Sequence, residues 1–92
     1  MSSIQPGSWS DFTFSIPHDA RKVFDAAMHG LVGVDYKPIA VATQVVAGTN
    51  YCFLCEATPI YPSATPYAAK VYLYQPLHGH HPHLVQIIHD KP

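Results

Sequence analysis

The chain has 92 residues, a length that suits one domain with one modest hydrophobic core. Hydrophobic residues make up 48% of it and charged residues only 12%, the opposite of the balance found in disordered chains. The chain has 5 Lys and Arg against 6 Asp and Glu, so no basic patch is available and we expect no nucleic-acid partner. No run approaches the length of a membrane-spanning segment, so we expect no membrane partner.

The N-terminus predicts a flexible arm, residues 1–10, at the start of a single domain that spans residues 1–92. This arm is rich in Ser, Gly and Pro and has neither a positively charged start nor an apolar run, so it does not resemble a signal peptide. The chain has 2 cysteines, too few for a disulfide scaffold. These features favour a cytoplasmic protein, or one secreted by a route that the chain does not show.

A short strand and a helix are expected next. Residues 11–15 alternate polar and aromatic side chains, which predicts a strand. Ser15 is a suitable helix N-cap, and Pro17 is tolerated in a first turn. An apolar stripe at helical spacing follows, made of Ala20, Val23, Phe24, Ala27, Met28 and Leu31. We therefore expect a helix of about four turns with one buried face, ended by Gly30 or Gly33.

The rest of the chain predicts an antiparallel sheet. Apolar and β-branched runs at 39–46, 50–58, 67–74 and 84–89 are separated by turn-forming residues. Gly48 can supply the positive φ of a tight turn between the first two runs. The fold class is therefore α+β, with one helix packed across a four- to five-stranded antiparallel sheet. We expect the aromatic residues to form its core and cross-strand pairs, namely Phe12, Phe14, Phe24, Tyr51, Phe53, Tyr67, Tyr72 and Tyr74.

The turn between the first two strands carries a recognisable motif, QVVAGTNY at residues 44–51. It resembles the Gln-x-Val-x-Gly loop of the cystatins, which inhibit papain-like cysteine proteases. All eight residues together are most similar to the stefins, the intracellular branch without disulfides. The order of predicted elements also agrees with a cystatin-like fold across nearly the whole chain. Identity outside the motif is low, and the helix is about one turn shorter than in a stefin.

The resemblance implies a reversible, competitive inhibitor that blocks the protease cleft with three segments at one end of the sheet. It assigns protease contacts to Gly7 in the arm, to Gln44, Val45, Val46, Ala47 and Gly48 in the first hairpin, and to Leu77 and His78 in the second. The second hairpin departs from the family, which often has Pro-Trp or a Leu-Pro turn there. The partner would be a papain-like protease, with no cofactor. The inhibitor would be a monomer that can also form a domain-swapped dimer.

The first hairpin has a physical interpretation of its own. Val45, Val46 and Ala47 form an apolar tip with few rotamers to order, which suits a concave and partly apolar cleft. Two alternatives stay open. The motif can be a buried hairpin of an unrelated sheet, or the fold can have lost inhibition and serve as a structural or partner-binding module.

Three further features of the sequence bear on possible chemistry. Cys52 and Cys55 lie three apart on a strand and should point to opposite faces, which excludes a joint redox or zinc site. The second hairpin loop holds four candidate metal ligands, His78, His80, His81 and His83. No carboxylate is adjacent to them, so a solvated polar loop is the favoured interpretation and no metal is assigned. No nucleophile motif, phosphate loop or carboxylate pair predicts an enzyme.

Trp9 lies in the arm two residues after Gly7. It can either pack back on the sheet or be offered to a partner, and packing is the favoured interpretation.

Overall fold

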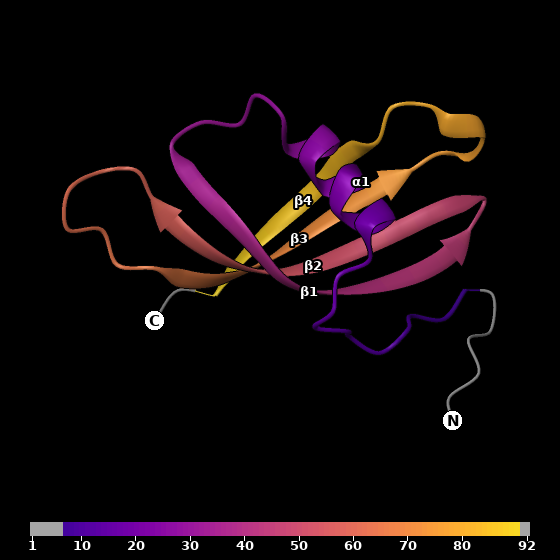
Figure 1. Cartoon of the computed structure of the whole chain (residues 1–92), viewed down its shortest axis with the longest axis horizontal. Coiled ribbons are helices and arrows are strands. Elements are labelled where there is room, and N and C mark those ends of the chain that lie inside the picture. The colour runs from indigo at the N-terminus through magenta and orange to yellow at the C-terminus, as the bar shows by residue number, and fades with distance from the viewer. Residues whose placement is uncertain (1–6, 91–92) are drawn as a thin grey trace.

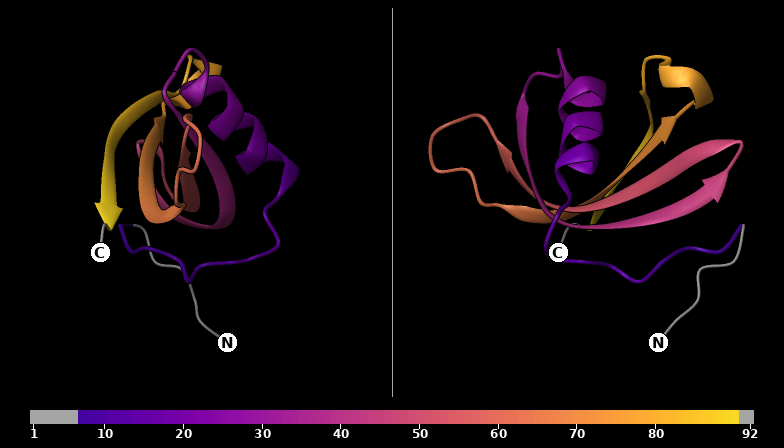
Figure 2. Two further views of the ribbon diagram at one scale, coloured as in Figure 1. Left: turned by 90° about the vertical axis from the view of Figure 1, so that its left-hand side faces the viewer. Right: turned by 45° about the vertical axis from the view of Figure 1, so that its right-hand side comes forward.

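The computed structural model describes residues 7–90, in which one α-helix crosses a four-stranded antiparallel sheet (Figure 1). The elements are α1 (His18–Met28), β1 (Val34–Val46), β2 (Gly48–Pro59), β3 (Tyr67–Gln75), the short 3-10 turn η1 (Leu77–Gly79) and β4 (His83–Asp90). The strand order is β1-β2-β3-β4, and the sheet curves around α1 (Figure 2). The α+β fold class is thereby confirmed, with four strands, in an arrangement consistent with a cystatin-like fold.

The helix is shorter than predicted and starts differently. It has 11 residues and follows Pro17, which stays extended, and no side chain caps its first turn. The predicted N-cap at Ser15 is therefore wrong. The helix ends at Met28, directly before His29 and Gly30, and Gly30 turns the chain with a φ of 90°. As a result Leu31 lies outside the helix and is 45% exposed.

The core lies between α1 and the sheet. Ala20 and Phe24 are the buried helix residues, and the ring of Phe24 lies 4.9 Å from that of Phe53. The largest side chains with almost no exposure are Phe53, Leu73, Val41, Val71 and Cys55. Because three strands contribute to this set, the helix and the sheet are held by one continuous apolar contact.

The segment before the helix does not form the predicted strand at 11–15. It instead follows the edge of β1 with two isolated bridges, one of Trp9 with Gln44 and one of Thr13 with Val41. The prediction that its aromatic side chains belong to the core is wrong, since Phe12 is 40% and Phe14 is 71% exposed. The expected arm is therefore paired with β1 over residues 7–10, while residues 1–6 lie outside the described part of the chain.

β1 begins at Val34, five residues before the predicted start, and contains Pro38. Pairing with β2 shifts register after Pro38, so Ile39 is the extra residue of a β-bulge. Proline donates no ladder hydrogen bond, and within sheets it occurs on edge strands and at bulges. Both conditions hold for β1, which explains why proline did not end the strand.

The turn from β1 to β2 depends on Gly48. Its φ is 102°, which confirms the predicted positive φ, and it is buried. A Cβ at this position would lie 2.5 Å from the carbonyl oxygen of Gln75 and 2.8 Å from the hydroxyl of Tyr74. Glycine is therefore required both for the backbone conformation and for the close approach of the turn to β3.

Replacing Gly48 with Ala should therefore be costly for the fold. We expect the free energy of unfolding to fall by at least about 3 kcal/mol, from left-handed strain plus a clash with a backbone oxygen. The matched control is Gly33→Ala, which has a similar φ of 95° and no atom within 4 Å of the added Cβ. That control should lose only about 1–2 kcal/mol. Urea unfolding followed by circular dichroism measures both, and equal losses would contradict the steric argument.

Candidate functional site

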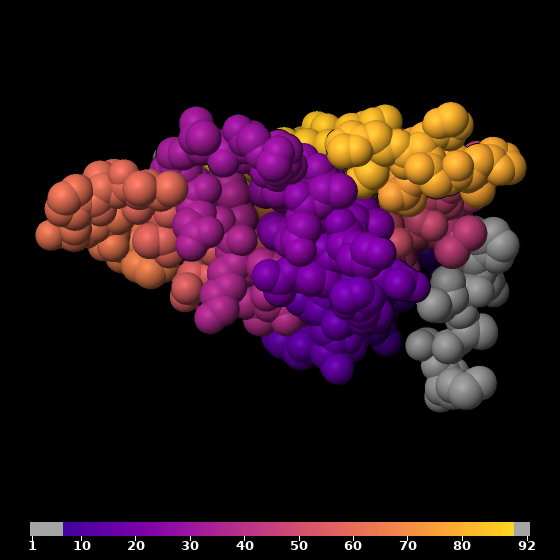
Figure 3. Space-filling model, turned by 45° about the horizontal axis from the view of Figure 1, so that its top comes forward, coloured from indigo at the N-terminus to yellow at the C-terminus, as the bar shows by residue number. Residues whose placement is uncertain are grey.

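Three segments meet at one end of the sheet, as the resemblance implies. Thr49 pairs with Gln75, which places the first hairpin tip beside the start of the second hairpin loop. The amide of Gly7 donates to the carbonyl oxygen of Val45 at 3.0 Å, so the arm also reaches this tip. Figure 3 shows the two hairpin tips together at one end of the molecule and the loop at 59–66 at the other. This end of the sheet is called the tip surface below; it consists of residues 7, 45–48 and 76–79.

Gln44 joins two of these segments through its side chain. Its Nε2 donates to the carbonyl oxygen of Gly7 at 2.9 Å, and its Oε1 accepts from Nδ2 of Asn50 at 2.8 Å. Both ends of the amide are thus used inside the chain. This side chain therefore positions the arm against the hairpin, a role that the sequence did not predict.

Tyr74 holds the first hairpin from the side of β3. Its hydroxyl donates to the carbonyl oxygen of Ala47, the residue at the turn. Neither this contact nor that of Asn50 was predicted from the sequence. Asn50 belongs to the eight-residue motif and could have been noticed there, but the tyrosine comes from another strand and carries no local signal. With Gly48 packed against Tyr74 and Gln75, the tip is fixed on two sides.

Apart from His78, the exposed side chains of the tip surface are apolar. Val45 is 49% exposed, Val46 is 41% exposed, Ala47 is exposed, and Leu77 on the second loop is 53% exposed. Gly48, by contrast, is buried against β3 of its own chain. The tip surface is thus a convex apolar edge whose backbone is held by internal contacts.

The second loop carries a residue in a conformation that favours glycine. His78 has a φ of 64° and a ψ of 27° within η1, and its side chain is exposed. The Nε2 of Gln75 donates across this loop to the carbonyl oxygens of Pro76, at 3.2 Å, and of His80. A left-handed histidine costs about 1–2 kcal/mol, so these hydrogen bonds help to hold the loop in this shape.

The histidines of the second loop do not form a metal site in the structure. Among residues 7–90, no three His, Cys, Asp or Glu side chains lie close enough to hold one ion together. The four candidates are His78, His80, His81 and His83, and all of them are exposed.

The two cysteines have different surroundings, as expected for residues three apart on a strand. Cys55 belongs to the core under α1, whereas Cys52 lines a hollow with Trp9 and Tyr72. Both thiols are free and buried. Burial raises the pKa of Cys52 and raises that of Cys55 to about 12, with nearby Cys52 adding to the second shift. Both therefore stay protonated at neutral pH and behave as small apolar residues.

Trp9 packs on the sheet, as favoured from the sequence. Its ring meets that of Tyr72 edge-on, with centroids 6.0 Å apart. The side chain keeps 42% of its surface exposed, so it covers the sheet only in part.

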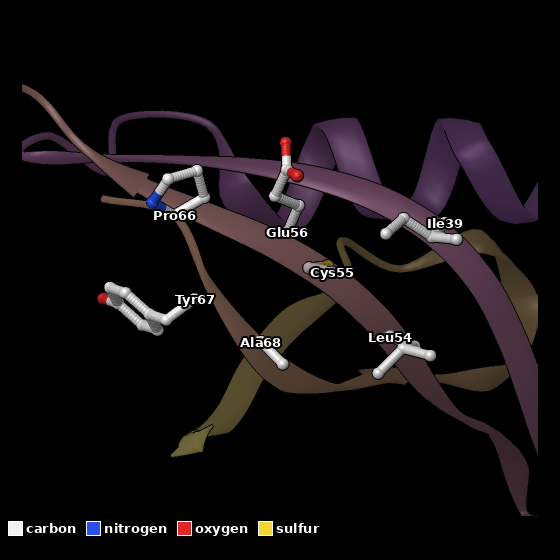
Figure 4. A pocket seen from close by; sticks show the side chains of 7 residues that line it. All are labelled: Ile39, Leu54, Cys55, Glu56, Pro66, Tyr67 and Ala68. Carbon is white, nitrogen blue, oxygen red and sulfur yellow. The ribbon is translucent and has the colours of Figure 1, made fainter. Parts of the chain in front are cut away.

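A shallow hollow of about 330 Å³ lies away from the tip surface (Figure 4). Its lining is mostly apolar, with Ile39, Leu54, Pro66 and Ala68 among its walls. The groups in this lining that can titrate are Glu56, Tyr67 and the thiol of Cys55, whose pKa is about 12. Of these groups, the Cys55 thiol stays protonated at neutral pH and is therefore a poor nucleophile.

Three comparisons with known proteins found no related protein. A scan against protein-family models found no match, and searches of curated proteins and of solved structures found none at a significant level. Within residues 7–90, no helix is long and apolar enough to cross a lipid bilayer.

The buried thiols predict slow chemical labelling of the folded protein. We expect 5,5′-dithiobis(2-nitrobenzoate) at pH 8 to react with Cys52 and Cys55 at least about 100-fold more slowly than in urea, because the thiols are buried and protonated. A Ser15→Cys variant supplies an exposed thiol as the control. The pKa values of both thiols are also higher in the folded protein than in the unfolded protein. This difference stabilises the folded state below about pH 9, and the stabilisation is lost as the pH rises toward 12. Rapid labelling of both native thiols would contradict this description.

Proposed function

We propose that the protein is a reversible, competitive inhibitor of papain-like cysteine proteases, of the cystatin type. The observation that supports this most is the gathering of Gly7, the motif hairpin and the second loop into one apolar tip surface. The motif residues and their location at the end of a curved sheet support the proposal independently of each other.

The physical case rests on how the tip is held. A convex surface binds a cleft tightly when its shape exists before binding, because ordering flexible loops costs free energy. Hydrogen bonds join Gly7 to Val45 and Tyr74 to Ala47. The side chain of Gln44 forms hydrogen bonds with both Gly7 and Asn50. The exposed valines are therefore presented on a backbone with little freedom left to lose.

Inhibition of this kind needs no reaction by the inhibitor. Val45, Val46 and Leu77 would enter the cleft, contact its apolar walls and exclude substrate. No peptide bond of the inhibitor would be presented for cleavage. The proposal accordingly assigns the chain no catalytic activity. The resemblance to the stefins extends it to a cytoplasmic inhibitor.

The central test of this proposal is titration of papain with the parent and with Val46→Asp. A charge forced into an apolar cleft without a partner should weaken inhibition by at least about 100-fold, corresponding to roughly 3 kcal/mol. Val32→Asp is the matched control, because Val32 is 89% exposed in the loop after α1, away from the tip surface. This control should inhibit like the parent.

Two results would count against the proposal. An inactive parent at micromolar concentration would favour a non-inhibitory partner-binding module of the same fold. Equal inhibition by the parent and Val46→Asp, with both folded, would remove the hairpin from the mechanism.

Gln44→Ala tests the positioning of the arm. Losing the hydrogen bonds to Gly7 and Asn50 should release the arm and speed dissociation of the papain complex about three- to tenfold, with little change in association. Stopped-flow kinetics measures both rates. Gln86→Ala, an exposed amide on β4, is the matched control. An unchanged dissociation rate for Gln44→Ala would show that this side chain does not position the arm for binding.

A further inference from the structure

The two edges of the sheet differ in how they are covered. Along β1, the amide of Ser10 donates to Thr43 at 2.8 Å, and Thr13 and Val41 exchange two backbone hydrogen bonds of 2.9 and 3.0 Å. Pro38 and the bulge at Ile39 further interrupt this edge. These are devices by which proteins keep an edge strand from pairing with another chain.

β4 is less protected than β1. Among the described residues, no backbone hydrogen bond reaches His83–Asp90 from outside its ladder with β3. The left view of Figure 2 shows β4 as the outermost strand on its side of the sheet. The strand contains no Lys, Arg or Pro, the residues that commonly protect an edge. Its register shift leaves Val85 as a bulge near one end, and residues 86–90 continue as a regular strand.

We propose that this edge is a homodimer interface, in which β4 pairs antiparallel with β4 of a second copy about a twofold axis. Regular residues 86–90 would supply the ladder, with Ile88 nearest the axis. The two four-stranded sheets would then form one continuous sheet. This inference goes beyond the proposed function and does not depend on it.

The side chains favour a second copy as the occupant. Ile88 is 48% exposed and lines a hollow of about 290 Å³, whose other walls include Leu54, Tyr72 and its cross-strand partner Lys70. Twofold pairing sets Ile88 against its own symmetry mate, so apolar surface meets apolar surface. In the 86–90 register, Gln86 stands opposite Asp90 of the second copy, so no two like charges oppose each other in the ladder. The edge can therefore pair with itself without setting like charges against each other.

The geometry leaves both tip surfaces open. The second hairpin loop immediately precedes β4, so the tip surface lies at the N-terminal end of that strand. Antiparallel pairing directs the two N-terminal ends of β4 away from each other. Each dimer would therefore present two tip surfaces at opposite ends.

Sedimentation velocity of the full chain from about 5 to about 500 µM tests the pairing, since a short edge interface should give a weak, concentration-dependent dimer. Ile88→Lys should weaken dimerisation at least about tenfold. Ile60→Lys is the matched control, because Ile60 is 69% exposed in the 59–66 loop, and it should dimerise like the parent. A parent that stays monomeric throughout, or a dimer insensitive to Ile88→Lys, would overturn the proposal.

A spin label separates edge pairing from strand exchange through the first hairpin and does not rely on Ile88. Gln86→Cys adds one exposed thiol to a chain whose own thiols are buried. Paired strands lie about 4.8 Å apart, so labels on both copies should approach within about 15 Å and broaden the spectrum as dimer forms. Ser15→Cys is the control and should show no broadening. Absence of broadening for Gln86→Cys in a dimeric sample would also overturn the proposal.

Discussion

The close approach of Gly48 to the end of β3 is the constraint on which the tip surface depends. Because no Cβ intervenes, the turn after β1 can lie directly on Gln75 and bring Ala47 within reach of the Tyr74 hydroxyl. The β2–β3 ladder places the first hairpin beside the second loop, and the contact of Tyr74 with Ala47 holds the turn there. The arm then follows, since Gly7 bonds to Val45 and to Gln44 of the same hairpin. The absence of a side chain at Gly48 therefore permits this arrangement of three segments that are distant in sequence.

The tip surface and the core divide the apolar residues between two tasks. Phe24, Phe53 and Leu73 are buried between helix and sheet, and they supply the free energy that keeps the sheet folded. Val45 and Val46 stay nearly half exposed and gain little from folding. Their position is maintained by polar contacts of the backbone and of Gln44 rather than by burial. Such a division allows the tip to remain apolar without collapsing onto the core.

The sequence predicted the elements with strong periodicity and missed those decided by distant contacts. The apolar stripe through Ala20 and Phe24 located α1, and the β-branched runs located the four strands. The first residues of β1 were missed because Asp35, Lys37 and Pro38 are poor strand formers. In the structure Asp35 and Lys37 pair regularly with β2, and a bulge follows Pro38. Phe12 and Phe14 looked like core residues because alternation alone does not say which edge a segment will follow.

The candidate site shows even more clearly that contacts between distant residues cannot be predicted from a local sequence pattern. The motif predicted that residues 44–48 form a hairpin, but a short local pattern does not distinguish a side chain that contacts a partner from one that holds the hairpin in place. Gln44 uses both ends of its amide for hydrogen bonds within the chain, and Gly48 is buried. Both residues therefore stabilise the shape of the tip rather than face a partner. The residues left to face a partner are the exposed valines, Ala47 and Leu77. A substitution at Gln44 or Gly48 would therefore alter binding through the shape of the tip, whereas one at Val46 would alter the contact itself.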